Sequence, residues 1–439
     1  MSDLKKTLTL STVVLFGLAY MTPTVVLATF GILADITQGG VPSAYVAALV
    51  AIIFTAISYG RMAAIYPMAG SAYTYVRKAI DTRLGFLAGW AVLLDYLFLP
   101  MAIWLIGSAY LHSAFPSIPQ PVWVLAFILA TTTVNVLGIK TANAINILMM
   151  TIQFLVLIAF VALCIHYVWG DATQPLWTIS PFIPTDGLDV SLIMSGAAIA
   201  CYSFLGFDAI TTLAEETRDS RRTIPKAILL TTVIGGAIFI TTSYFVQLSH
   251  PGANFENTDA AAFEIAKNIG GDIFVSIFMT GMLVGQFASG LASQASASRL
   301  LFAMGRDNVL PKQLFGKLGK YQTPVNALIL CGAVALLALK LDVSTSTSFI
   351  NFGAFLAFSL VNLSVIFACY IGKEKQGLKS HLMYLACPVI GILAMLWLMM
   401  SLDHLAVTLG SIWLACGFAW LLWLTRGFRR PTPELHIDA

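Results

Sequence analysis

Charge is scarce in this sequence. Only 10% of its 439 residues are Asp, Glu, Lys or Arg, whereas 58% are hydrophobic. A soluble chain of this length needs far more charge to cover its surface, so the composition excludes an ordinary soluble globular protein. Apolar runs of about twenty residues recur along the chain. They predict a polytopic membrane protein built of α-helices.

Several chemical signatures are also missing. The six cysteines are scattered singly among apolar stretches, so their spacing indicates neither a disulfide framework nor a metal site. There is no His-Glu-x-x-His motif, nucleophile elbow or phosphate-binding loop, and the six histidines are isolated. We therefore expect no enzyme, no cofactor and no metal. The net charge of +3 is too small to indicate a nucleic-acid partner. A repeated filter loop or continuous polar pore lining, typical of channels, is not visible either.

The apolar runs predict a fold class: an all-α membrane protein forming a single transmembrane domain over residues 1–439. The twelve expected spans lie at residues 9–34, 42–66, 84–112, 121–138, 143–169, 190–216, 225–249, 272–304, 324–340, 346–371, 381–401 and 405–425. The connections between them are short. Glycines at four-residue spacing, as in the pairs Gly85/Gly89 and Gly281/Gly285, predict close helix packing.

The basic residues predict the orientation. With twelve spans, all the Lys and Arg residues except Lys267 and Lys340 fall on the side of the membrane that holds both termini. Positive charge accumulates on the cytoplasmic side of membrane proteins. We therefore expect both termini in the cytoplasm and the chain in a bacterial inner membrane, in contact with lipid.

Two spans carry helix-breaking residues at corresponding positions of the two halves. Span one contains Pro23, which removes a backbone donor and clashes with the preceding turn. Span six contains Gly206 in the run LGF. Interrupted spans at matching positions are the best sequence indication of a transport site at the membrane midplane.

Acidic residues lie within spans three and six, namely Asp95, Asp208 and Glu215. A charge at the centre of a membrane helix costs about 2.5–3.5 kcal/mol, so each needs a partner or a water-filled cavity. If span six continued as one helix, Asp208 and Glu215 would lie about 10 Å apart on one face. That arrangement would suit a cation.

Several motifs resemble those of the amino acid–polyamine–organocation (APC) transporters. The matching runs are GFDAI at 206–210, AEE at 214–216, RTIPKAI at 222–228, SRLLFAMGRDNVLP at 298–311 and GFLAGW at 85–90. The resemblance implies a five-plus-five inverted repeat with broken helices 1 and 6, working by alternating access. It implies a first repeat at 9–169, a second at 190–371 and two extra helices at 381–425.

The sequence departs from the amino-acid carriers of that family in two places. Their break in span one is rich in glycine, and its free N–H groups bind the substrate carboxylate. Here the segment Met21–Thr24 has no glycine pair, and Pro23 deletes a donor. Many members also have a lysine in span five where this sequence has Gln153. Acids without a fixed cation favour a cationic substrate, because like charges repel strongly at low dielectric.

A short diamine fits both departures. We expect one ammonium on Asp208 and the carbonyls freed at the breaks, and the other near Glu215. Aromatic rings would grip the methylenes and supply cation–π faces. The segment Tyr20–Thr24 resembles the putrescine-importer branch, and the family's polyamine sites carried across make Glu215 and Tyr110 the leading contacts. The remaining expected site residues are Asp208, Asp95, Tyr202, Phe204, Gly206, Phe207, Tyr20, Met21, Thr22 and Thr24.

Other interpretations stay open. Asp208 could bind only an α-amine or orient the backbone, Asp95 could tether helices, and Tyr110 could be an interfacial tyrosine. An amino-acid permease for cationic or neutral substrates, or a diamine/amino-acid exchanger, would share the fold. As the coupling ion we expect a proton rather than sodium, carried by Glu215, Asp208 or Asp95, because buried carboxylates can exchange protons near neutral pH.

Overall fold

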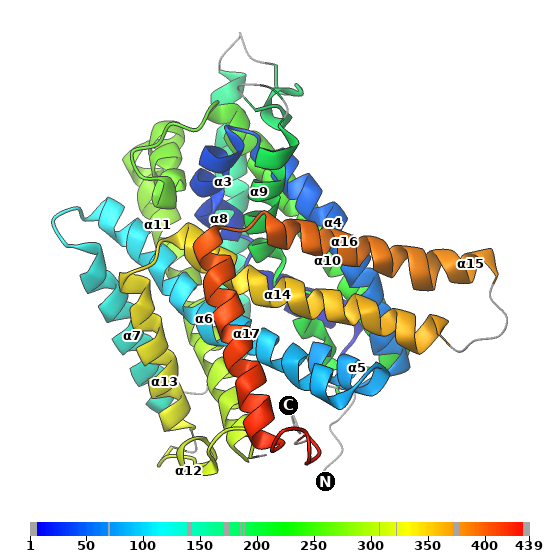
Figure 1. Ribbon diagram of the computed structural model, residues 1–439. Helices are drawn as coiled ribbons and strands as arrows, with labels where there is room; N and C mark the ends of the chain where they lie inside the picture. The colour runs from blue at the N-terminus through cyan, green and yellow to red at the C-terminus, as the bar shows by residue number, and fades with distance from the viewer. Residues whose placement is uncertain are drawn as a thin grey trace.

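The computed structural model describes residues 7–68, 71–137, 143–170, 175–184, 187, 189–306, 308–321, 323–371 and 377–432. Within these residues, eleven helices are long and apolar enough to cross a membrane (Figure 1). A twelfth apolar segment, Val325–Leu339, is shorter. The predicted all-α membrane protein is confirmed, with eleven of the expected spans at full length and the ninth, at residues 324–340, formed by the shorter segment.

The first five spans follow the expected order. They are formed by α1 (Leu10–Met21) with α2 (Val25–Ala28) and α3 (Phe30–Thr37), then α4 (Val41–Ile65), α6 (Thr82–Ala114), α7 (Gln120–Leu137) and α8 (Asn143–Trp169). A short helix, α5 (Ser71–Ala79), lies between α4 and α6.

The remaining spans begin with the interrupted span six. It consists of α9 (Val190–Ala200) and the 3-10 segments η2 (Cys201–Phe204) and η3 (Ala209–Leu213). The later helices are α10 (Ser220–Ser249), α11 (Ala261–Arg306), α12 (Lys312–Phe315), α13 (Val325–Ala335), α14 (Val343–Val365), α15 (Leu378–His381), α16 (Cys387–Met400) and α17 (His404–Leu424).

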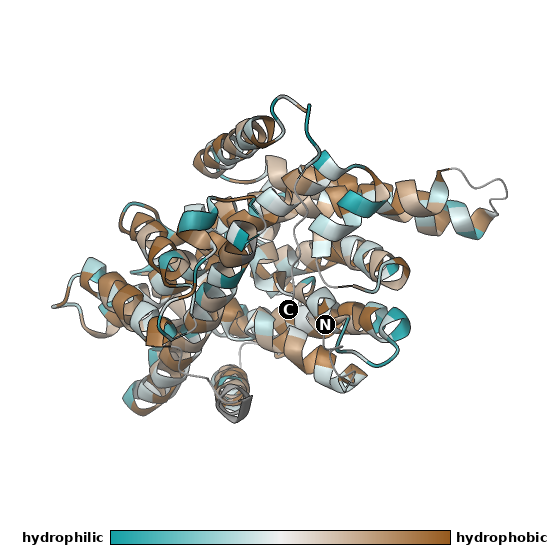
Figure 2. Cartoon of the chain, turned by 90° about the horizontal axis from the view of Figure 1, so that it is seen from below, coloured by the Kyte–Doolittle hydropathy of each residue, from teal (hydrophilic) through white to brown (hydrophobic). Residues whose placement is uncertain are grey.

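The outward surface of the bundle is apolar. Large side chains such as Leu129, Trp169, Ile273 and Met400 expose between 67% and 84% of their surface. Hydrophobic residues run along the helices, while hydrophilic ones gather mainly at helix ends and connections (Figure 2). A surface of this kind would be costly in water but is compatible with lipid tails.

The structure differs from the sequence prediction in two connections. The segment expected as a linker before span eight contains the first turns of α11, which bends at Gly271, where φ is +63°. The connection expected after span two contains the helix α5. Its first six residues, 71–76, are buried, and the helix packs on α6.

Small residues allow these helices to approach closely. A Cβ atom placed on Gly85 would lie 2.6 Å from Cβ of Arg77 in α5, and one on Gly281 would lie 2.6 Å from Cγ2 of Val156 in α8. The predicted packing role of the glycine pairs in spans three and eight is confirmed.

The start of the described chain is paired with the segment after span six. The N–H groups of Thr7 and Leu8 donate to the carbonyl of Glu216, and the N–H of Arg218 donates to the carbonyl of Leu8. Residues Leu8 and Thr217 thus form a short parallel bridge. The two termini lie at one end of the bundle, which also holds α12 (Figure 1).

Candidate functional site

Span one breaks where the proline predicted it. Helix α1 ends at Met21, and Thr22 takes a left-handed conformation with φ of +51°. The chain resumes helical structure at Val25. A non-glycine residue with positive φ is uncommon and stores strain, which is typical of functional segments.

Span six breaks at Gly206, whose φ of +115° is accessible almost only to glycine. The carboxylate of Asp208 accepts a hydrogen bond from the Gly206 N–H at 3.3 Å, so this acid helps to hold the turn. Both predicted interruptions are therefore confirmed.

The assumption that span six continues as one α-helix beyond Asp208 is wrong. Residues Ala209–Leu213 form a 3-10 helix, followed by turns up to Glu216. The side chain of Asp208 is buried, whereas that of Glu215 is exposed. The expected spacing of these two acids along one helical face therefore does not apply.

The two breaks touch each other. A Cβ atom on Gly206 would lie 2.3 Å from Cδ1 of Tyr20 and 3.1 Å from its Cβ. Only a glycine leaves room for the Tyr20 ring at this point. The backbone of span six is therefore held directly against the last turn of α1.

A small cavity of about 40 Å³ lies beside this contact. Four of the predicted site residues line it: Tyr20, Met21, Thr22 and Tyr202. The rest of the lining comes from Val25, Leu99, Ile103, Ile106, Leu205, Gln286 and Ser289. Aromatic rings, apolar walls and a few polar groups thus meet at the interrupted helices.

A second cavity of about 180 Å³ shares Tyr20, Thr22, Leu99 and Ser289 with the first. Its other lining residues are Phe16, Ala19, Met149, Met150, Gln153, Ala288, Ala292, Ser293 and Ser296. It lies along α1 on the side nearer the chain termini, because it includes Phe16 and Ala19. The shared residues make the two cavities neighbours along one path.

The polar residues of α11 in these cavities were missed by the sequence interpretation. Gln286, Ser289, Ser293 and Ser296 follow each other at intervals of three and four residues, so they lie on one helical face. This polar stripe within an apolar span is the signal that could have revealed them.

The acids Asp95 and Asp208 are both buried, at 9% and 6% exposure. Their carboxyl groups are close enough to interact electrostatically, and both interact with the hydroxyl of Tyr20. Oδ1 of Asp95 has no hydrogen-bond partner among the described residues. Neither acid lines the two cavities, but Tyr20 joins them to the cavity wall.

The structure places the remaining predicted residues away from the 40 Å³ cavity. Phe204 packs edge-on against Phe239, and Phe207 packs against Tyr59 and Phe358. These two rings thus belong to the packed interior. Asp208 is buried near them, and Glu215 is at the exposed end of the segment.

Two further predicted residues, Tyr110 and Thr24, make hydrogen bonds that connect span one to other spans. The Tyr110 hydroxyl, fully buried, donates to the carbonyl of Leu27 at 2.9 Å. The Thr24 hydroxyl donates to Oε1 of Gln153 at 3.2 Å. Gln153 thus connects span five to the break in span one at the position where many APC transporters have a lysine.

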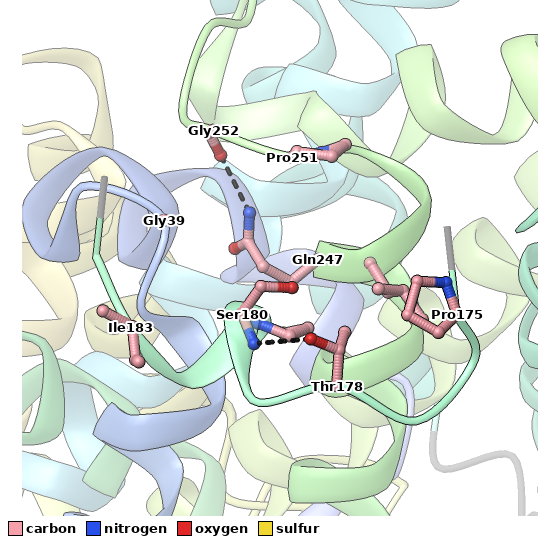
Figure 3. A pocket seen from close by; sticks show the side chains of 10 residues that line it. Gly39, Pro175, Thr178, Ser180, Ile183, Gln247, Pro251 and Gly252 are labelled. Atoms are coloured by element: carbon pink, nitrogen blue, oxygen red, sulfur yellow. Dashed lines mark hydrogen bonds between the residues drawn. The ribbon is translucent and has the colours of Figure 1, made fainter. Parts of the chain in front are cut away.

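A separate cavity of about 330 Å³ lies at the other end of the bundle, around the end of α3 (Figure 3). At its base Nε2 of Gln247 donates to the carbonyls of His250 and Gly252, at 3.1 and 2.9 Å. None of the predicted site residues lines it. Among the described residues, no group of three His, Cys, Asp or Glu side chains could hold a metal ion.

Comparison with known proteins adds evidence of a different kind. A family model described as "Amino acid permease" matches residues 12–419. The "Low-affinity putrescine importer PlaP" of Escherichia coli (strain K12) is 42% identical over 98% of this chain and 96% of its own length. Two proteins of Bacillus subtilis (strain 168) are each 26% identical to this chain. The "Branched-chain amino acid permease BcaP" matches over 87% of this chain and 85% of its own length. The "Methylthioribose transporter" matches over 85% of this chain and 83% of its own length. The similarity covers both breaks and nearly every helix.

Proposed function

Because this chain belongs to the amino acid permease family of APC transporters, we propose that it imports putrescine or a similar short diamine across a bacterial inner membrane. The strongest support is the likeness to the putrescine importer of Escherichia coli, at 42% identity over almost the whole chain. The other relatives are named for amino acids or methylthioribose and are less similar, at 26% identity.

The chemistry of the cavities supports a cation. Neither lining contains Lys or Arg, and the two buried acids lie behind Tyr20. A primary ammonium in the 40 Å³ cavity would meet the rings of Tyr20 and Tyr202 and the backbone carbonyls freed at the breaks. The amide of Gln286 and the hydroxyl of Ser289 offer further acceptors for the amine protons.

The break in span one offers little to a carboxylate. Pro23 has no N–H to donate, and the glycine pair of the amino-acid carriers is missing from the sequence here. The residue at the family's lysine position is Gln153, which is neutral and already accepts from Thr24. An α-amino acid would thus find its ammonium accommodated and its carboxylate poorly compensated.

We assign the transport cycle to alternating access by a five-plus-five inverted repeat, with both termini in the cytoplasm. Proton coupling through Asp95, Asp208 or Glu215 is favoured over sodium. Glu215 and Tyr110 are kept as proposed amine contacts. The exposed position of Glu215 suits an amine passing the cytoplasmic end of the path, and that of Tyr110 suits one passing the outer half of span one.

A substrate panel with the purified protein in liposomes tests the proposal. We expect uptake of radiolabelled putrescine that cadaverine competes and that ornithine and alanine do not. Robust transport of an α-amino acid without competition by diamines would instead support an amino-acid permease. If internal ornithine is required for putrescine to move, the protein is an exchanger.

The role of Glu215 has its own test. Glu215→Gln keeps the size of the side chain and removes its charge, so we expect uptake to fall severely while the protein remains folded. Glu216→Gln, its neighbour, is the matched control and should retain uptake. Normal transport by Glu215→Gln would show that this acid has no central role.

A further inference from the structure

A group of buried oxygen atoms near the span-six break lacks hydrogen-bond partners. Within the described chain, no partner with the geometry of a hydrogen bond is found for the hydroxyls of Ser58 and Tyr59 in α4, those of Ser71 and Tyr75 in α5, or Oδ1 of Asp95 in α6. All five residues expose 9% of their surface or less. Unpaired buried polar groups are rare in folded proteins, because each loses its hydration without gaining a partner. Five of them in adjoining helices call for an occupant.

Four of these five residues are connected to Asp208. Tyr59 and Tyr75 each interact electrostatically with Asp208. The Tyr59 hydroxyl also interacts with Ser71 and the Tyr75 hydroxyl with Thr211. The rings of Tyr59 and Tyr75 are 6.0 Å apart, and the Tyr59 ring is 5.5 Å from that of Phe207 beside the acid. Asp95 faces Asp208 from α6. We call Tyr59, Ser71, Tyr75, Asp95 and Asp208 the tyrosine–aspartate cluster.

The charge of the cluster is uncompensated in the described part of the chain. Besides interacting with each other, the two acids interact with five tyrosines from five elements: Tyr20 of α1, Tyr59 of α4, Tyr75 of α5, Tyr96 of α6 and Tyr202 of η2. Helix α14, which packs on α5 and α6, contributes no titratable residue between Val343 and Val365. Two carboxylates in a low-dielectric interior need a positive charge close by.

We propose that the tyrosine–aspartate cluster is a hydrated site that holds the coupling proton between Asp95 and Asp208, separate from the amine cavity. Hydroxyl groups suit this role because each can both donate and accept a hydrogen bond, so the same groups can follow a proton that binds and leaves. A metal ion would use only their acceptor capacity. The inference rests on the proposed diamine transport and adds the place of coupling.

The tyrosine–aspartate cluster is connected to the amine cavity through one residue, Tyr20. None of the five residues of the cluster lines the 40 Å³ or the 180 Å³ cavity. Tyr20 belongs to both regions, because it lines both cavities and interacts with Asp95 and Asp208. Tyr20 also touches Gly206 at the break. Protonation of the cluster would therefore change the charge behind one wall of the amine cavity.

Two assays on the protein in liposomes separate coupling from amine binding. The first measures exchange of labelled for unlabelled putrescine without any gradient, and the second measures accumulation driven by an imposed pH gradient. Tyr59→Phe and Tyr75→Phe each remove one hydroxyl and leave the amine cavity intact. We expect exchange within about twofold of wild type and gradient-driven accumulation reduced at least about tenfold, the effect of losing one hydrogen bond to a charged group.

The matched control is Tyr45→Phe. Tyr45 is a fully buried tyrosine of the same helix α4, and its hydroxyl is bonded to Thr29 and Ser203 rather than to an acid. It should not lower accumulation relative to exchange. If Tyr59→Phe cannot be purified folded, Ser71→Ala removes another unpaired oxygen with a smaller change of volume.

Three results would overturn the proposal. One is that putrescine accumulation by the wild type depends on a sodium gradient and not on the pH gradient. Another is Tyr59→Phe and Tyr75→Phe lowering exchange and accumulation in parallel. The third is both variants coupling normally with raised thermal stability, as expected when an unpaired hydroxyl is simply removed. Each leaves diamine exchange by the wild type in place, whereas absence of that exchange would refute the proposed function itself.

Discussion

The contact between the two broken spans makes Gly206→Ala the most informative single substitution. An alanine there has to adopt φ near +115°, a conformation that costs about 1–3 kcal/mol for a residue with a side chain. Its Cβ would also overlap Cδ1 of Tyr20, at 2.3 Å, with the body of the ring behind it. Overpacking of this kind costs a further 1–3 kcal/mol or so. The total is about 2–6 kcal/mol, a large part of the stability of a typical protein.

The two contributions can be measured separately. Gly252 also has a positive φ, +93°, but a Cβ there meets nothing within 4 Å. Gly252→Ala therefore reports the backbone cost alone. We expect Gly206→Ala to lower the melting temperature in detergent distinctly more than Gly252→Ala. Putrescine uptake should also fall at least about tenfold, since a displaced Tyr20 ring needs to cost only 1.4 kcal/mol of binding for that effect.

A second variant tests the partner in the contact. Tyr20→Ala removes the ring that the new methyl group would strike, so the double variant Gly206→Ala/Tyr20→Ala should lose less stability than the two single effects added together. Additive losses, or equal melting temperatures for Gly206→Ala and Gly252→Ala, would refute the contact as the reason for glycine at this position.

Three further predictions concern single contacts. Thr24→Val should lower the melting temperature, at a cost of roughly 1–3 kcal/mol, because the buried Gln153 amide loses its partner; Thr24→Ser restores the hydroxyl and should be close to wild type. Ser289→Leu should fill the 40 Å³ cavity, which would appear as a strong rise in KM for putrescine in a protein that still folds. Leu8→Pro removes the N–H that donates to Glu216 and should lower stability by about 1 kcal/mol, whereas Leu8→Ala keeps that donor; equal stabilities would show the bridge to be dispensable.

Much of the architecture could be predicted because a membrane imposes simple rules on the chain. Each span has to be long, apolar and helical, so composition and run length were enough to find the eleven long spans and the shorter segment Val325–Leu339. The helix α5 escaped because it carries Arg77 and Lys78 and is too short and polar to cross lipid. It is held by burial against α6, and burial of that kind is invisible in a hydropathy pattern.

Features of the site that depend on local sequence were predicted, whereas those that depend on the packing of helices were not. The breaks at Pro23 and Gly206 are local properties of the backbone, and the structure shows both. The expected separation of Asp208 and Glu215 along one helical face was wrong, because it assumed an α-helix where the chain forms a 3-10 segment and turns. Gln286 and Ser289 were overlooked because a mild polar stripe gains meaning only once its helix is known to face the breaks.

The sequence by itself determined that the chain spans a membrane, where its helices lie, where two of them break and to which family it is related. Those properties follow from the solvent, the backbone and inherited motifs. Only the tertiary structure decided that Gly206 meets Tyr20, that Gln153 binds Thr24, and that Asp95 and Asp208 share one buried cluster with tyrosines of α4 and α5. These contacts join residues as many as 186 positions apart, as for Tyr20 and Gly206. Which residues meet at such separations depends on the packing of whole helices against one another.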